Sequence, residues 1–114
     1  MGISEDARKT ADAIRERGWT QGGTIGPTGR VCLVGGIRAA RGWKDSSISA
    51  RDFKHVYKWE APLRNAIAEY LGTDVYNPSN IWRWNDDDRT SQESILEMLE
   101  NVAIKHAPDE MRSE

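Results

Sequence analysis

Few side chains in this sequence are suited to covalent or metal chemistry. Cys32 is the only thiol, and a thiol nucleophile needs a nearby base, for which the chain offers only His55 and His106. One cysteine and two widely separated histidines lack the paired spacing of a zinc site. Cys32 also lies in a repeat of small residues, where cysteine acts as a compact apolar side chain. We therefore expect a structural role for Cys32 and predict no metal or cofactor.

The acidic run that starts at Asp86 resembles a calcium-binding EF-hand loop in part. Oxygen-bearing side chains fall at loop positions 1, 3, 5, 7, 9 and 12, namely Asp86, Asp88, Thr90, Gln92, Ser94 and Glu97. Position 6 requires glycine for its sharp turn, and here it is Ser91. The stretch TSQE, residues 90–93, is also typical of a helix start. Both features argue against calcium binding.

Residues 20–30, TQGGTIGPTGR, hold four glycines and one proline and predict a loop. A glycine-rich loop can cradle phosphate, but neither GxxxxGK[ST] nor GxGxxG occurs in it. Arg30 alone does not replace the lysine of a phosphate-binding loop, so we do not expect a phosphate site here.

The tryptophans are better candidates for binding. Trp82 and Trp84 lie two residues apart and cannot share one face of a helix or a strand. If Trp84 anchors the core, Trp82 is left near the surface beside Arg83, and Trp and Arg are enriched at protein–protein hot spots. The alternative is that both tryptophans are buried. Trp43 and Trp59 lie near a basic segment, and for them too the sequence leaves both burial and surface exposure open.

The elements that position these residues follow from hydrophobic periodicity. A first helix is predicted over 5–17, with Ser4 as N-cap and Gly18 just beyond its end. A second is predicted over 31–41, although the apolar run at its start is also compatible with a strand. Small residues repeat along one face of this second helix and predict a close approach by another helix, at Cys32, Gly36 and Ala39.

Pro62 divides the next helical pattern, because proline lacks an amide proton and disfavours a helical conformation at the preceding residue. We therefore predict two segments, about 50–59 and 62–71, with Pro62 as the first residue of the second.

A short turn is predicted over residues 79–84, with Asn85 and Asp86 satisfying its backbone through local Asx-type hydrogen bonds. Thr90 and Glu93 then form a capping box that opens the last helix.

The predicted architecture is a single all-α domain of four to five helices over 1–107, with a glycine-rich loop after the first helix. The last helix is expected to end near residue 106, leaving 108–114 as a flexible C-terminal tail. A chain of 114 residues with 38% hydrophobic residues suits one modest core. No apolar run reaches the roughly 18 residues of a membrane span, and the single cysteine and the lack of a signal-peptide pattern predict a reducing cytoplasm.

Charge is unevenly distributed along the chain. Residues 30–64 carry eight Lys/Arg against three Asp/Glu, whereas residues 65–114 carry four against eleven. The acidic C-terminal part argues against a simple nucleic-acid-binding protein, whose usual feature is a basic surplus. A nucleic-acid-binding module nevertheless stays an alternative, and it would use the basic residues Arg38, Arg41, Lys44, Arg51, Lys54 and Lys58.

Three segments together resemble a family of small uncharacterised proteins of actinobacteria and their phages. These are ERGWTQGG, GRVCLVGGIRAA and WNDDDRTSQESILEML, which carry GW-x-QG, G-R-V-C-L-x-G and W-N-D-x-x-x-R-T motifs. The resemblance covers residues 7–104 and implies no established activity. It implies a phage or actinobacterial origin, and polar residues of the shared motifs are Gln21, Arg30, Asn85, Asp86 and Arg89.

The leading hypothesis is a phage-encoded accessory protein that binds a host or phage protein and impairs host growth. The second is a small enzyme in which the motif polar residues converge on one pocket with Cys32. The third is the nucleic-acid-binding module. The lack of a catalytic set, the many tryptophans and the uneven charge favour a protein-binding function over an enzymatic one. The oligomeric state stays open.

Overall fold

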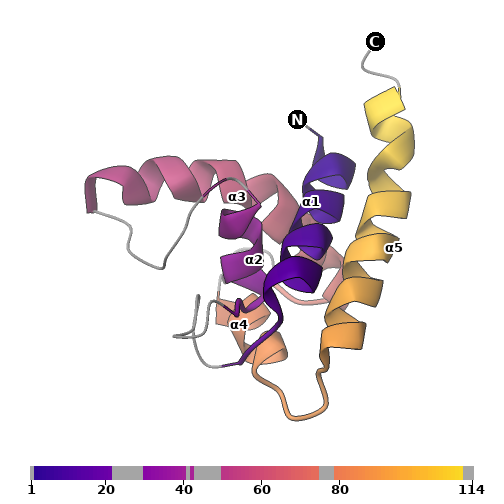
Figure 1. The fold of residues 1–114 in the computed structure, drawn as a ribbon. Coiled ribbons are helices and arrows are strands. Elements are labelled where there is room, and N and C mark those ends of the chain that lie inside the picture. The colour runs from indigo at the N-terminus through magenta and orange to yellow at the C-terminus, as the bar shows by residue number, and fades with distance from the viewer. Residues whose placement is uncertain (1, 22–29, 41, 43–49, 75–78, 112–114) are drawn as a thin grey trace.

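The computed structural model describes residues 2–21, 30–40, 42, 50–74 and 79–111. Its helices are α1 (Ile3–Arg17), α2 (Leu33–Ala39), α3 (Ala50–Leu71), α4 (Ser79–Asn85) and α5 (Gln92–Met111) (Figure 1). The only extended contact in these ranges is an isolated bridge between Trp19 and Val31. The all-α prediction is confirmed, whereas most of the glycine-rich loop lies outside the described residues.

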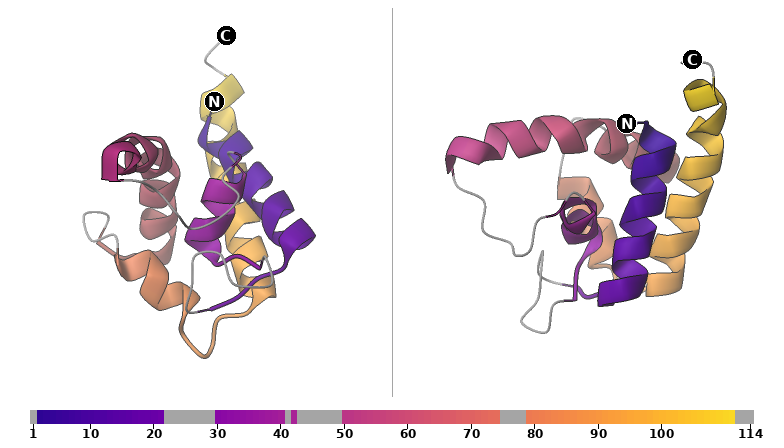
Figure 2. Two further views of the ribbon diagram at one scale, coloured as in Figure 1. Left: turned by 60° about the vertical axis from the view of Figure 1, so that its left-hand side comes forward. Right: turned by 45° about the horizontal axis from the view of Figure 1, so that its top comes forward.

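The core forms where α1 and α5 lie side by side and run in opposite directions (Figure 1). Helix α3 crosses this pair, and α2 and α4 fill the space below it (Figure 2). Each helix contributes apolar side chains at helical spacing, and the largest of these that are fully buried include Ile14, Leu33, Ile37, Leu63, Ile67, Ile95 and Leu99.

Helices α1 and α2 meet at a small residue, as the sequence predicts. A methyl group on Gly36 would lie 2.8 Å from Cγ1 of Ile14, so only glycine allows this approach without a shift. The helix is shorter than expected, because Val31 pairs with Trp19 and Cys32 becomes the N-cap of α2. Its Sγ accepts a hydrogen bond from the Gly35 amide at 3.4 Å.

The start of α1 also differs from the prediction. Gly2 is the N-cap residue, and Ser4 is buried within the first turn, where its hydroxyl accepts a hydrogen bond from Arg8 at 2.9 Å. The predicted end holds: α1 stops at Arg17, and Gly18 follows with a φ of 85°, a value that favours glycine.

The predicted break at Pro62 is wrong, because α3 continues through it. A proline inside a helix costs about 3 kcal/mol, so other contacts must offset it. Leu63 and Ile67 are fully buried just after the proline. Glu60 on one side of Pro62 also pairs with Arg64 on the other, at 3.0 Å. Tertiary burial on both sides therefore holds one helix together.

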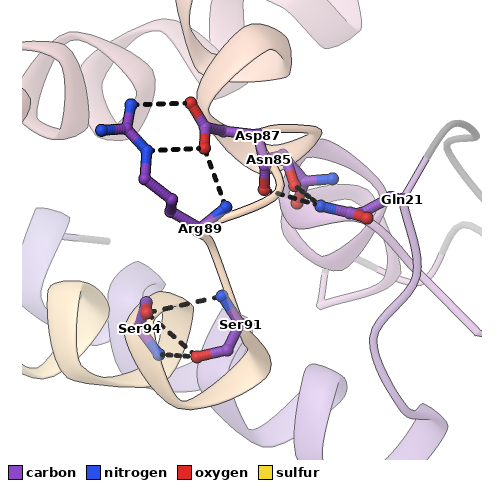
Figure 3. A network of polar contacts seen from close by, with 6 residues as sticks. All are labelled: Gln21, Asn85, Asp87, Arg89, Ser91 and Ser94. Carbon is purple, nitrogen blue, oxygen red and sulfur yellow. Dashed lines mark hydrogen bonds and ion pairs between the residues drawn. The ribbon is translucent and has the colours of Figure 1, made fainter.

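Three expectations toward the C-terminus are also corrected. Residues 79–84 belong to helix α4 rather than to a turn. The cap of α5 is Ser91, not Thr90: the Ser91 hydroxyl accepts from the Ser94 amide at 3.2 Å, and the Ser91 amide donates to the Ser94 hydroxyl at 3.4 Å. This reciprocal pair has the geometry of a capping box shifted by one residue (Figure 3). Helix α5 also continues beyond the expected end, to Met111.

Because Ser91 rather than Thr90 caps α5, removing these two neighbouring hydroxyls should lower the free energy of unfolding by different amounts. We expect Ser91→Ala to lower the free energy of unfolding by about 1 kcal/mol, the usual cost of losing a serine cap. Thr90→Val should change it by less than about 0.5 kcal/mol, because no hydrogen bond of the Thr90 hydroxyl is found in the described part of the chain. Urea unfolding of both variants checks this, and the reverse order would restore Thr90 as the cap.

Candidate functional site

Asn85, at the end of α4, joins segments that are far apart in the sequence. Its side chain is 2% exposed. The Oδ1 atom accepts hydrogen bonds from the indole N–H of Trp19 at 2.8 Å and from the backbone amide of Leu33 at 3.0 Å. The Nδ2 atom donates to the Thr20 carbonyl at 3.3 Å and to Asp86 at 3.0 Å. Because both partners of Oδ1 are donors, the orientation of the amide is fixed.

This pattern corrects the predicted local Asx turn at Asn85 and Asp86. Three of the partners of the Asn85 side chain, namely Trp19, Thr20 and Leu33, lie 52 to 66 positions away along the chain. The side chain therefore joins the end of α4 to α2 and to the segment that follows α1, rather than closing the backbone of its own turn.

Gln21 reinforces the same junction from the surface. Its Nε2 atom donates to the backbone carbonyls of Asn85 and Asp87, at 3.0 Å and 2.9 Å (Figure 3). The segment that ends α1 is thus held against the segment that ends α4 by side-chain amides on both sides. We define Trp19, Gln21 and Asn85 as the amide junction.

The five polar motif residues do not form one cluster. Gln21, Asn85 and Asp86 are joined by the hydrogen bonds of the junction. Arg89 points elsewhere and pairs with Asp87, while Arg30 is exposed and lies against Gly18. Since the amides of Gln21 and Asn85 are already engaged with the fold, this arrangement favours a structural role for them over acid–base or nucleophilic chemistry.

Cys32 lies in the hydrophobic core and is 6% exposed. Burial raises the pKa of its thiol above the usual value, despite opposing hydrogen bonds from the Gly35 and Val34 amides. A raised pKa reduces the thiolate fraction on which nucleophilic reactivity depends. The environment therefore matches the structural role that the sequence predicts for this residue.

Helix α4 presents its two tryptophans differently. Trp82 is 49% exposed, whereas Trp84 is half-buried and packs against the core. Arg83, between them, is exposed. Of the two alternatives left open by the sequence, the structure therefore shows one anchoring and one exposed tryptophan, and not two buried ones. Trp43 and the side chain of Trp59 lie outside the described residues, so the choice between burial and exposure stays untested for both.

A buried ionic cluster, which sequence reasoning missed, joins α2 to α3. Glu60 is fully buried and accepts from Nε of Arg38 at 2.5 Å and from Nη1 of Arg64 at 3.0 Å. Both arginines are also buried. The spacing of Glu60 and Arg64 at i and i+4 was visible in the sequence, but Arg38 lies 22 residues away from Glu60.

The cluster also removes Arg38 from the proposed nucleic-acid surface, because a buried, ion-paired guanidinium does not reach a phosphate backbone. Lys58 is exposed. Arg41, Lys44 and the side chains of Arg51 and Lys54 lie outside the described residues. No described feature therefore adds support to nucleic-acid binding.

A pocket of about 280 Å³ opens between α4 and the start of α5. We call it the α4–α5 pocket; it is lined by Trp84, Asp87, Arg89, Thr90 and Ser94. Asp87 and Arg89 form a two-pronged ion pair at its rim, with Nε–Oδ1 and Nη2–Oδ2 distances of 3.2 Å (Figure 3). Hydrogen bonds from Arg89 lower the pKa of Asp87 and keep it ionised.

The described residues contain no group of three His, Cys, Asp or Glu side chains placed to hold a metal ion. Among the same residues, none of the helices combines the length and hydropathy of a membrane-crossing segment.

Comparison with known proteins gives one match. A family model described as "Family of unknown function (DUF6197)" matches residues 2–105. Because the match covers most of the 114 residues, the chain belongs to this family. Searches of curated proteins and of solved structures found no match.

Proposed function

We propose that this member of the family is a small accessory protein, phage-encoded and acting in the bacterial cytoplasm, that binds a host or phage protein. The observation that carries the proposal is the exposed Trp82. An indole that is half exposed places a large apolar surface in water, and its burial against a partner would remove that surface.

The support of α4 strengthens this proposal. Ile81 is buried one residue before Trp82, and Asn85 fixes the end of the same helix to α2 and to the segment that follows α1. Trp82 and Arg83 therefore stand on a rigid base. A backbone that is already ordered loses less conformational freedom on binding, which favours affinity.

The proposal predicts that Trp82→Ala abolishes partner capture without unfolding the protein. Tagged wild-type protein and variants would be incubated with host lysate, and captured proteins would be identified and rebound in purified form. Truncation of a residue that acts as an interface hot spot costs about 2 kcal/mol or more, so binding should weaken about 30-fold or more. If capture impairs growth, expression of Trp82→Ala in the host should relieve that effect.

Ile104→Ala is the matched control, because Ile104 is also a large exposed apolar residue, at 58%, but lies on α5. It should capture the same partner as the wild type. Equal capture by the wild type and Trp82→Ala, or no specific capture at all, would contradict the proposal.

A further inference from the structure

The α4–α5 pocket contains a hydroxyl group that the fold does not use. Thr90 lines the pocket and is 8% exposed. Within the described residues, its backbone amide donates to the Asp87 carbonyl, but its hydroxyl has no hydrogen-bond partner. In the same part of the chain, every side-chain nitrogen or oxygen sealed from solvent does have a partner. The small exposed part of Thr90 must therefore include its hydroxyl, which opens on the pocket.

Arg89 brings charged donors to the same pocket. Its side chain is 90% exposed and forms an ion pair with Asp87, whose carboxylate also accepts a hydrogen bond from the Arg89 amide at 2.8 Å. A guanidinium has five N–H donors, and Asp87 accepts two of them through Nε and Nη2. Three donors are left for a ligand.

The other residues that line the pocket indicate which further chemical groups a ligand should have. Trp84 is half-buried and offers an aromatic surface, while Ser94 belongs to the first turn of α5, where the helix dipole favours an anion. Asp87 brings a full negative charge to the rim, which disfavours a doubly charged phosphate more than a singly charged carboxylate. The pocket therefore suits a carboxylate beside an apolar group.

We infer that the α4–α5 pocket binds a carboxylate of a peptide segment, held by Arg89 and Thr90, with an adjacent apolar side chain packed on Trp84. The identification of this peptide as part of a protein partner rests on the proposed function. The pocket itself lies on the Trp84 side of α4, whereas Trp82 projects from the helix at a different angle. The two sites would therefore contact one partner on both sides of α4.

The test uses the full chain and a small probe. N-acetyl-leucine carries one carboxylate and one apolar side chain, and N-acetyl-leucinamide is its neutral counterpart. In ¹H–¹⁵N NMR titrations, the acid should shift the Trp84 indole N–H, the Thr90 amide and the Arg89 Nε–H, with a dissociation constant on the order of 1 mM. The amide should bind at least about tenfold more weakly, because it loses the charge-assisted hydrogen bond.

Substitutions distinguish binding of the acid in the pocket from a general effect of surface charge. Arg89→Gln should weaken binding of the acid about tenfold, and Thr90→Val about two- to tenfold, the usual range for one hydrogen bond. Arg15→Gln is the matched control, since Arg15 also pairs with a nearby aspartate, Asp12, on an exposed helix surface. It should leave the titration unchanged.

Three results would overturn the inference: no shift with the acid, equal shifts with acid and amide, or inorganic phosphate binding as tightly as the acid. Probe binding and partner capture are measured separately, which keeps the two proposals distinguishable. Probe binding without partner capture would assign the pocket and reject the proposed function, whereas partner capture without probe binding would do the reverse.

Discussion

Glu60→Ala should lower the free energy of unfolding by about 3–5 kcal/mol, the cost of removing one member of a buried ion pair. The fully buried Glu60 carboxylate lies between two buried guanidinium groups, those of Arg38 and Arg64. Its removal leaves these positive charges close together in the interior without the carboxylate. A protein of this size is usually stable by only 5–15 kcal/mol, so the variant would lose a large part of its stability.

Urea unfolding followed by tryptophan fluorescence measures the loss. Asp12→Ala is the control, because Asp12 pairs with Arg15 on the exposed surface of α1. Exposed pairs contribute about 0–1 kcal/mol. If Glu60→Ala lowered the free energy of unfolding no more than Asp12→Ala, the buried cluster would contribute no more to stability than an exposed ion pair.

A triple variant separates the cost of an unpaired charge from the value of the cluster. Replacing Arg38, Glu60 and Arg64 together with Met, Leu and Met removes all three charges and keeps similar volumes. Such replacements are often neutral or stabilising in the interior of proteins. We expect the triple variant to be more stable than Glu60→Ala, and a triple variant as unstable as the single one would contradict this account.

Asn85→Ala should be the second most costly change, at roughly 2–4 kcal/mol. The substitution leaves the Trp19 indole N–H and the buried Leu33 amide without their acceptor. Each buried donor that loses its partner costs about 1–3 kcal/mol. It also leaves the Thr20 carbonyl without its donor. Because these groups belong to α2 and to the segment that follows α1, the junction between distant parts of the chain should loosen.

Two measurements identify this mechanism. Urea unfolding gives the loss of stability, and hydrogen exchange should accelerate at the Leu33 amide and the Trp19 indole. Asn80→Ala is the control on the same helix, since its amide donates to the exposed Asp74 carbonyl at 3.2 Å. Water can replace that bond, so the cost should stay within about 0.5 kcal/mol.

Two outcomes would contradict the assigned role of Asn85. One is an equal cost for the Asn80 and Asn85 variants. The other is strict additivity in the double variant Trp19→Phe/Asn85→Ala, because residues that share a hydrogen bond should show a coupling of at least about 0.5 kcal/mol.

Some features of the candidate sites depend on contacts that are local in the sequence, and others depend on contacts between distant segments. The spacing of Trp82 and Trp84 placed them on different faces but left open whether both are buried, and the structure shows that Trp82 is exposed while Trp84 packs against the core. The α4–α5 pocket was not predicted, because it depends on where Arg89 and Thr90 fall after α4 ends, and the sequence indicated a turn at 79–84 and a cap at Thr90. A shift of one residue in the cap changes Thr90 from a structural hydroxyl to a group available to a ligand.

By itself, the sequence determined the helical class, the end of α1 before Gly18, the end of α3 at Leu71, and the small-residue face of α2 that includes Gly36. These features depend on residues within one or two turns of each other, so periodicity and end signals suffice to predict them. Only the tertiary structure decided that α3 continues through Pro62, that Asn85 bonds to Trp19 and Leu33, and that Glu60 is buried between two arginines. The physical reason is that burial and pairing across 22 to 66 residues outweigh a local preference of about 3 kcal/mol or less, and no local pattern records them.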